Sequence, residues 1–209
     1  MSVKTMRAGF YLELIRAVFQ AVDEQGKLRH RVVAFTSATA GEGVSHTVSL
    51  LAEELAAQTQ NRVLLVESTA LQNLPSLDPS QVWRYCEETE VDNLLTLSAP
   101  KSSSRLAAVG AARPGEWESA PELRAECLKA LRWNFDYVLI DCPSPAVSSD
   151  ATTLASLVDG FSVVVKAGQT RRGQIQRCQQ MIEQAGGRFL GFILNQRQYP
   201  VPGWLYRRL

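Results

Sequence analysis

Short apolar runs alternate with longer segments of helical periodicity along most of this chain. The runs lack the polar alternation of a half-exposed strand, so they predict strands buried on both faces of a parallel sheet. We expect these strands over residues 32–35, 62–67, 94–97, 137–140, 160–166 and 189–194. Apolar spacing predicts helices over residues 10–22, 48–55, 121–133, 149–157 and 172–185, with a short helix over 82–88. This alternation indicates an α/β fold, with a mostly parallel sheet flanked by helices.

The remaining segments are connections and ends. Residues 68–80 and 99–115 are rich in Ser and Pro, which predicts loops, and the second is expected to be a mobile surface loop. The length of 209 residues suits a single domain over 1–209. We expect residues 1–30 to be an N-terminal helical segment, and residues 199–209, with two prolines, to be an irregular tail.

A glycine-rich turn joins the first predicted strand to the next helix in Arg31–Thr47, RVVAFTSATAGEGVSHT. Strand, glycine-rich turn and helix form the layout of a phosphate-binding loop (P-loop), in which backbone N–H groups and the helix N-terminus face the phosphates. Ser45 stands where such a loop places the hydroxyl that holds magnesium, but the preceding lysine position is Val44. The predicted nucleotide-binding residues are Gly41, Glu42, Gly43, Val44, Ser45 and His46.

Two carboxylates, Glu67 and Asp141, follow the second and fourth predicted strands. Parallel α/β sheets bind ligands beyond the carboxyl ends of their strands, where the glycine-rich turn also lies. We therefore expect both carboxylates beside the loop, with Ser45 and Asp141 as magnesium ligands if nucleotide binds.

Composition narrows the function classes. The net charge of +1 gives no electrostatic case for nucleic acid as a partner. No apolar run approaches the roughly 20 residues of a membrane span, and the N-terminus lacks the pattern of a signal peptide. The four cysteines include no CxxC pair, which predicts reduced thiols in a cytosolic protein, and no zinc spacing is present.

Four stretches together resemble the bacterial tyrosine kinase (BY-kinase) family, a branch of the MinD/ParA-like P-loop ATPases. AFTSATAGEGVSHT resembles the family loop TS-x-x-PGEGKST, and NRVLLVESTALQ resembles its second acidic motif, KRVLLIDADLR. FDYVLIDCPSPAVSSDA resembles the Walker B stretch YDYVIIDTPP with its following helix, and GFSVVVKAGQTRRGQI with GGRFLGFILNQ resembles the segment near the family's end. The resemblance covers about residues 10–199 and implies a cytoplasmic ATPase partner of membrane proteins that control polysaccharide chain length and export.

Within this resemblance, several family positions are altered. The two aspartates of the second acidic motif are Glu67 and Thr69, and its arginine is Gln72. The N-terminal assembly motif E-x-x-R-x-x-R keeps Glu13 and Arg16 but has Phe19 in its last position, and the C-terminal tyrosine cluster is reduced to Tyr199 and Tyr206. Asp141, Pro143 and Asn195 keep the pattern, and the resemblance implies that Asn195 faces the nucleotide base.

The altered positions predict a site without catalysis. Loss of the lysine's charge-assisted contact removes about 2–4 kcal/mol of transition-state stabilisation, or roughly 10²–10³ in rate. Thr69 also lacks the carboxylate that would orient the nucleophile, while the backbone loop and Ser45 leave weakened ATP or ADP binding with magnesium. The first hypothesis is a cytoplasmic pseudo-ATPase, peripheral at the inner membrane through a partner. That partner would be a polysaccharide co-polymerase, a sister ATPase or a further copy in a homo- or hetero-oligomer, contacted through helix 10–22 and the tail.

Two alternatives remain. One is an active ATPase or tyrosine autokinase with a non-standard loop, rescued by a cation from Lys166, Arg171, Arg172 or a second subunit. The other is a MinD/ParA-like positioning factor outside polysaccharide work.

Overall fold

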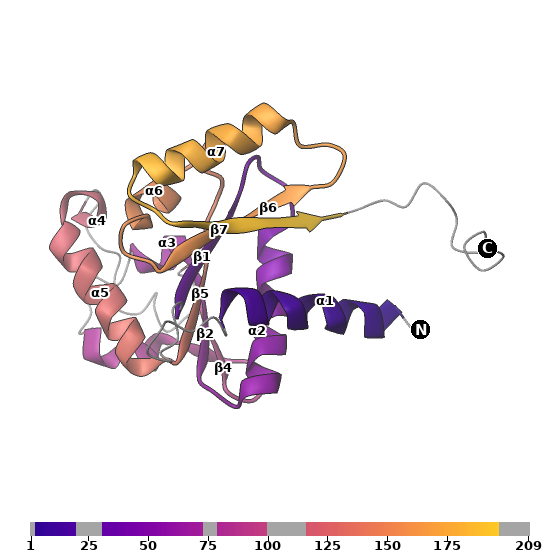
Figure 1. Ribbon diagram of the computed structural model, residues 1–209. Helices are drawn as coiled ribbons and strands as arrows, with labels where there is room; N and C mark the ends of the chain where they lie inside the picture. Colours follow the sequence, from indigo (N-terminus) through magenta and orange to yellow (C-terminus); the bar gives the residue numbers. More distant parts are fainter. Residues whose placement is uncertain (1–2, 20–30, 73–78, 100–115, 197–209) are drawn as a thin grey trace, which may run out of the picture.

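The computed structural model describes residues 3–19, 31–72, 79–99 and 116–196. Its centre is a seven-stranded sheet in the order β3-β4-β2-β5-β1-β6-β7 (Figure 1). The strands are β1 (Val32–Ser37), β2 (Val63–Glu67), β3 (Glu87–Glu88), β4 (Leu94–Leu97), β5 (Tyr137–Asp141), β6 (Gly160–Lys166) and β7 (Phe189–Asn195). Every neighbouring pair is parallel except β3 with β4. The predicted α/β fold is therefore confirmed.

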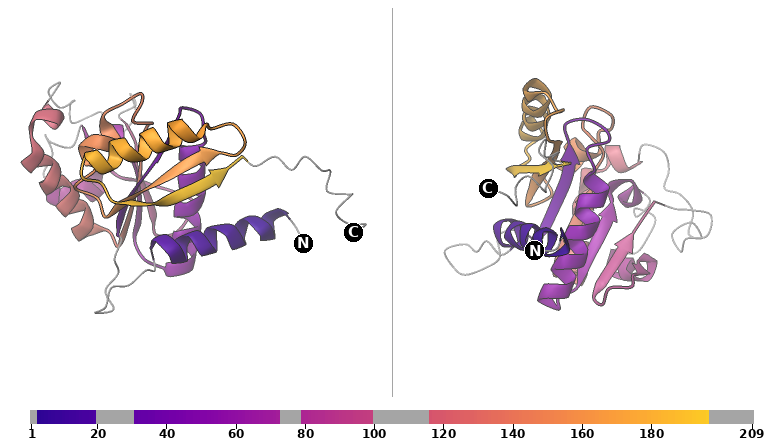
Figure 2. Two further views of the ribbon diagram at one scale, coloured as in Figure 1. Left: turned by 45° about the horizontal axis from the view of Figure 1, so that its top comes forward. Right: turned by 90° about the vertical axis from the view of Figure 1, so that its right-hand side faces the viewer.

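Helices cover both faces of this sheet (Figures 1 and 2). They are α1 (Val3–Val18), α2 (Val44–Thr59), α3 (Ser68–Leu71), α4 (Glu116–Ser119), α5 (Pro121–Asn134), α6 (Asp150–Leu154) and α7 (Arg172–Gln184), with a 3₁₀ helix, η2, over Pro79–Tyr85. Across the described residues, no helix combines the length and apolar character that a membrane span needs.

Alternation along the central strands divides the core into two layers. In β1, Val32 and Ala34 pack with α5, α6 and α7, whereas Val33 and Phe35 pack with α1 and α2. All six residues of β1 are buried, as its continuous apolar run predicts for a strand covered on both faces. These two layers hold the central strands in place, and the residues at the carboxyl ends of the strands therefore meet at one edge of the sheet.

Besides smaller shifts at the ends of α2 and α6, three predicted elements differ from the structure. The N-terminal helix begins at Val3 rather than at residue 10 and ends at Val18, and part of its predicted end lies outside the described residues. The predicted loop 68–80 contains α3, and the predicted helix 82–88 is instead the end of η2 followed by β3. A four-residue helix and a two-residue strand are too short to give a periodic signal, which explains both errors.

Some predicted segments lie outside the described residues. They are most of the loop 99–115, the tail 199–209 with Tyr199 and Tyr206, and residues 20–30 of the N-terminal segment. The single-domain boundary 1–209 stays a prediction.

Candidate nucleotide-binding site

The glycine-rich turn connects β1 to α2 and has the backbone shape that its sequence predicts. Gly41 and Gly43 have φ angles of 83° and 84°, in the left-handed region that residues with a Cβ rarely adopt. Gly43 also precedes the first residue of α2, and a Cβ added there would lie 2.5 Å from Nδ2 of Asn195. The turn therefore needs glycine at residue 43 for both its backbone angle and its close approach to β7.

Glu42 fastens this turn to the ends of two other strands. Its side chain is only 2% exposed, and its Oε2 accepts a hydrogen bond from the Thr39 N–H at 3.0 Å. Its Oε1 accepts from the Thr170 hydroxyl and, at 3.4 Å, from the Lys166 N–H at the end of β6. Its backbone carbonyl accepts from Nδ2 of Asn195 at 2.8 Å. The loop is thus held by protein contacts on both sides.

Val44 takes the position where the sequence pattern expects a lysine. Its side chain is 9% exposed and packs in the apolar cluster of α1, α2 and β1, with Phe35 and Val48 among its members. It also lines the cavity beside the loop. The position therefore contributes an apolar wall where a phosphate-binding lysine would contribute positive charge.

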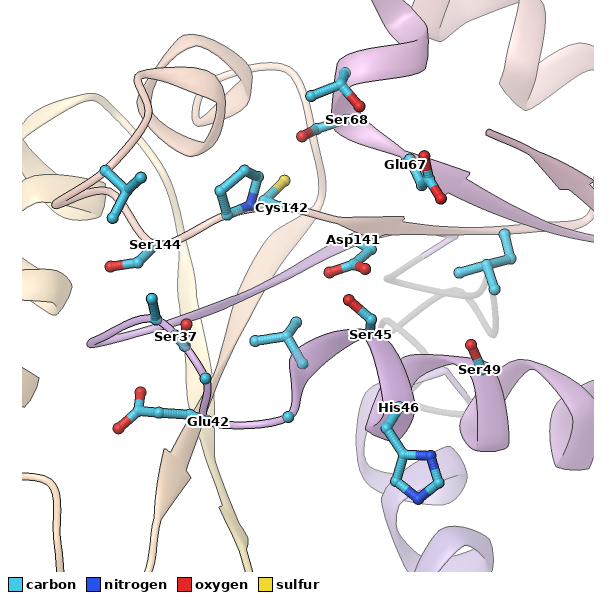
Figure 3. Close-up of a pocket in the computed structure, with 18 of the residues that line it drawn as sticks. Ser37, Glu42, Ser45, His46, Ser49, Glu67, Ser68, Asp141, Cys142 and Ser144 are labelled. Carbon is cyan, nitrogen blue, oxygen red and sulfur yellow. The ribbon is translucent and has the colours of Figure 1, made fainter. Parts of the chain in front are cut away.

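Asp141 and Glu67 lie side by side at the carboxyl ends of β5 and β2, where they are paired in register (Figure 3). Burial raises the pKa of Asp141 above its usual value, a hydrogen bond with the Ser45 side chain opposes this rise, and the charge of Glu67 adds to it. Glu67 Oε2 also accepts a hydrogen bond from the Ala99 N–H at 2.8 Å. The structure therefore brings together Ser45, Asp141 and Glu67, as predicted.

These groups match the ligand chemistry of magnesium, which prefers carboxylate and hydroxyl oxygens beside substrate phosphates. Ser45 and Asp141 would hold such an ion, which would supply positive charge to bound phosphate oxygens. Elsewhere in the described parts of the chain, no cluster of three or more His, Cys, Asp or Glu residues has metal-binding geometry.

A cavity of about 780 Å³ opens between the loop and the two carboxylates. Hydroxyl side chains are frequent in its lining, which is formed by Ser37, Ala40, Gly41, Glu42, Gly43, Val44, Ser45, His46, Ser49, Leu65, Glu67, Ser68, Thr69, Thr96, Ser98, Asp141, Cys142, Pro143, Ser144 and Val147. Among the described residues that line it, none is a lysine or an arginine. The cavity is therefore acidic and lacks a permanent cation of its own.

The other cations and the predicted base contact lie elsewhere. The described residues that line the cavity do not include the candidate cations Lys166, Arg171 and Arg172. The side chain of His46 is exposed and points away from Asp141 (Figure 3). Asn195 is also absent from the lining, and its side-chain amide donates a hydrogen bond to the loop carbonyl of Glu42. Its contact with a nucleotide base stays a prediction.

Sequence reasoning missed a buried network around Asp150, at the start of α6. Its carboxylate accepts hydrogen bonds from the Ser68 hydroxyl at 2.6 Å, the Ser148 hydroxyl at 2.6 Å and the Gln72 side-chain amide at 3.1 Å. The network joins α3 to the segment after β5, and both segments line the cavity. Gln72, which stands at the family's arginine position, was the signal that could have indicated this partner.

The four cysteines are buried thiol side chains. All four are buried and unpaired. Burial raises the pKa of Cys86 and of Cys127 to about 12 and is the main cause that raises the pKa of Cys178 to about 11. The thiols are therefore protonated at neutral pH and behave as small apolar groups.

A glycine-rich strand-to-helix loop, facing carboxylates at the carboxyl edge of a mostly parallel sheet, defines the class of P-loop NTPase-like proteins. No family model matches the sequence. The chain is 28% identical over 198 residues to the tyrosine-protein kinase CpsD of Streptococcus agalactiae. This match covers 88% of this chain and 82% of that protein.

Solved structures agree with this relationship. The BceF tyrosine kinase domain is 28% identical, with a TM-score of 0.62 over 78% of this chain and 68% of that one. The VpsO kinase domain shares the fold at 22% identity, with a TM-score of 0.68 over 94% of this chain and 97% of that one. The chain is thus similar in sequence to BY-kinases and shares their MinD/ParA-like P-loop fold.

Proposed function

We propose that this chain is a degenerate BY-kinase-like pseudo-ATPase that serves as a regulatory or scaffold subunit. The observation that carries the proposal is the absence of lysine and arginine from the described lining of the cavity, with Val44 packed into the core at the lysine position. Phosphoryl transfer depends on positioning and on neutralising the charge of the phosphates. Here Val44 supplies no charge, and Asp141 and Glu67 add negative charge.

Nucleotide binding is expected to be weakened rather than abolished. The loop keeps its left-handed glycines, and the start of α2 still presents backbone N–H groups. Magnesium held by Ser45 and Asp141 would offset part of the acidic charge. Binding of ATP or ADP with magnesium therefore remains compatible with the site, whereas Thr69 supplies no carboxylate to activate a nucleophile.

The proposed setting is the cytoplasmic side of exopolysaccharide synthesis or export. The resemblance of the sequence to BY-kinases supports this setting, as does the kinship with CpsD. The partner would be a membrane polysaccharide co-polymerase or a sister ATPase, which would hold the chain peripherally at the inner membrane. The chain would act there by binding its partner rather than by turnover.

Calorimetric titration with ADP and with ATP, each with magnesium, tests the proposal directly. We expect the wild-type chain to bind with a Kd weaker than about 10 μM. Val44→Lys should tighten binding, because it restores a charge-assisted contact with the phosphates. Val44→Met is the matched control, because it supplies a long unbranched side chain without charge and should leave affinity unchanged.

Turnover provides the second readout. The wild-type chain should hydrolyse no ATP above the level of Ser45→Ala, which removes the proposed magnesium hydroxyl. Measurable hydrolysis or autophosphorylation by the wild-type chain, lost in Ser45→Ala, would contradict the proposal and favour an active enzyme with a non-standard loop.

A further inference from the structure

The glycine-rich loop lies between the proposed magnesium ligands and the outer strands of the sheet. It follows β1, which has β5 with Asp141 on one side and β6, then β7, on the other. The Ser45 side chain hydrogen-bonds with Asp141, whereas the loop carbonyl of Glu42 accepts from Asn195 at the end of β7. Magnesium bridges the terminal phosphates of a bound nucleotide. A nucleotide with those phosphates near Asp141 would therefore direct its base away from β5, toward the ends of β6 and β7.

Asn195 has both ends of its side-chain amide engaged by backbone groups. Its Nδ2 donates to the Glu42 carbonyl at 2.8 Å, and its Oδ1 accepts from the Gln196 N–H at 2.8 Å. These two partners fix which end of the amide is nitrogen and which is oxygen. Turning the amide toward a base would break both hydrogen bonds and release the loop from β7. Asn195 is therefore suited to holding the loop.

Gln196 follows directly and carries a second amide, which lies over the loop. Its φ of 53° is in the left-handed region, so the chain turns at the end of β7. A Cβ added to Gly43 would lie 3.2 Å from Nε2 of Gln196, which places this amide close to the loop backbone. Gln196 is exposed, and its side chain makes no hydrogen bond within the described parts of the chain. Its donor and its acceptor are therefore available to a ligand beside the loop.

The hydrogen-bonding pattern of a glutamine amide matches adenine better than guanine. Adenine presents an amino donor at N6 next to an acceptor at N7, and one amide can pair with both. Guanine presents two acceptors, O6 and N7, at the same edge, so the amide oxygen would meet another acceptor. A second exposed glutamine, Gln169, lies in the turn after β6, where its N–H bonds the Lys166 carbonyl of the same turn. Gln196 is thus the glutamine that lies against the loop itself.

We propose that the side chain of Gln196, rather than that of Asn195, selects adenine over guanine in a nucleotide bound at this loop. The inference rests on the weakened nucleotide binding proposed above, and it adds the residue that recognises the base. Asn195 is then a positioning residue that holds the loop against β7.

Ligand-observed NMR titration of the full chain with ADP and with GDP, each with magnesium, measures this selectivity and follows Kd values into the millimolar range. The wild-type chain should bind ADP about fivefold to tenfold more tightly than GDP, the low end for a bidentate base contact because Gln196 is exposed. Gln196→Ala should bring the two Kd values together. Gln196→Arg should reverse the preference, because a guanidinium donates to both O6 and N7 of guanine.

Two further variants separate recognition of the base from the shape of the loop. Asn195→Ala should weaken the binding of ADP and of GDP by the same factor and keep their ratio. Gln169→Ala is the matched control and should also keep the ratio. Equal wild-type affinities, a ratio that survives Gln196→Ala, or a ratio lost in Asn195→Ala or Gln169→Ala would overturn this inference and leave the proposed nucleotide binding intact.

The remaining outcomes distinguish this inference from the proposed function. If the wild-type chain binds neither nucleotide, the inference and the proposed weak binding are both refuted. If the wild-type chain hydrolyses ATP and Gln196→Ala still removes the preference for ADP, only the pseudo-ATPase proposal is contradicted.

Discussion

Replacing Glu42 with alanine is expected to release the phosphate-binding loop from β6 and to destabilise the fold. The carboxylate is almost fully buried and accepts hydrogen bonds from the Thr39 N–H and from the Thr170 hydroxyl. Alanine leaves the Thr39 N–H without this partner. The Thr170 hydroxyl retains the Lys166 carbonyl, 3.2 Å away, as an alternative acceptor.

The expected cost follows from these partners. A hydrogen bond to a charged group contributes about 1.5–3 kcal/mol, and an unpaired buried donor costs about 1–3 kcal/mol. Because the Thr170 hydroxyl is partly compensated, we expect Glu42→Ala to cost about 2–4 kcal/mol in unfolding free energy. At about 2–4 °C per kcal/mol for a domain of this size, the Tm should fall by about 4–16 °C.

Calorimetric unfolding of three variants measures this effect. Glu42→Gln keeps an amide oxygen as acceptor for Thr39 and should lose about half as much stability as Glu42→Ala. Thr170→Val removes the hydroxyl, and its effect should be smaller in the Glu42→Ala background than in the wild-type chain. A Tm change below about 2 °C for Glu42→Ala, or full additivity with Thr170→Val, would refute the inference that Glu42 fastens the loop.

Substitutions at three further residues test other parts of the site and the opposite edge of the sheet. Burial raises the pKa of Asp141, so its ionised form destabilises the folded chain. Asp141→Asn should therefore raise the Tm measured in thermal scans at pH 7. This gain in Tm should fade as the pH falls toward about 4, where the wild-type carboxyl becomes protonated. Burial tends to raise the pKa of Asp159, but hydrogen bonds from Arg132 and from backbone N–H groups lower it overall. Asp159→Asn should therefore cost about 2 kcal/mol at pH 7, and urea titrations should show this gap closing below about pH 4, as the wild-type carboxylate is protonated. Gln72→Ala should cost about 1–2 kcal/mol in unfolding free energy, because it removes a hydrogen-bond donor from the buried Asp150 carboxylate. Gln72→Arg should retain stability in the same denaturation assay. Equal losses of stability in both variants would count against this contact.

Continuous apolar runs were sufficient to predict the central strands. In β1, β5 and β6, burial on both faces requires apolar residues at nearly every position, and this requirement is visible in the sequence. The carboxyl-edge rule then placed Glu67 beside Asp141, and their register in β2 and β5 confirms that placement. Local pattern and one topological rule therefore sufficed for these parts of the fold.

Contacts between distant segments were not predictable in the same way. Glu42 and Thr170 are separated by 128 positions, and Ser68 and Asp150 by 82. Nothing in the local sequence of either residue identifies its partner, because serine, threonine and acidic residues suit many exposed positions equally well. Such pairs follow from how the segments after β2, β5 and β6 converge at one edge.

The contacts of Glu42 and Asn195 separate the shape of the loop from its charge. Both residues hold the loop through protein groups, and neither contact involves the side chain at residue 44. With valine instead of lysine at residue 44, the site lacks a positive charge, but the contacts of Glu42 and Asn195 that hold the loop remain. If Val44→Lys restores nucleotide affinity while Glu42→Ala in the same background removes it, loop shape and loop charge are separate requirements for binding. If Val44→Lys binds equally well with and without Glu42, the anchors matter for stability alone.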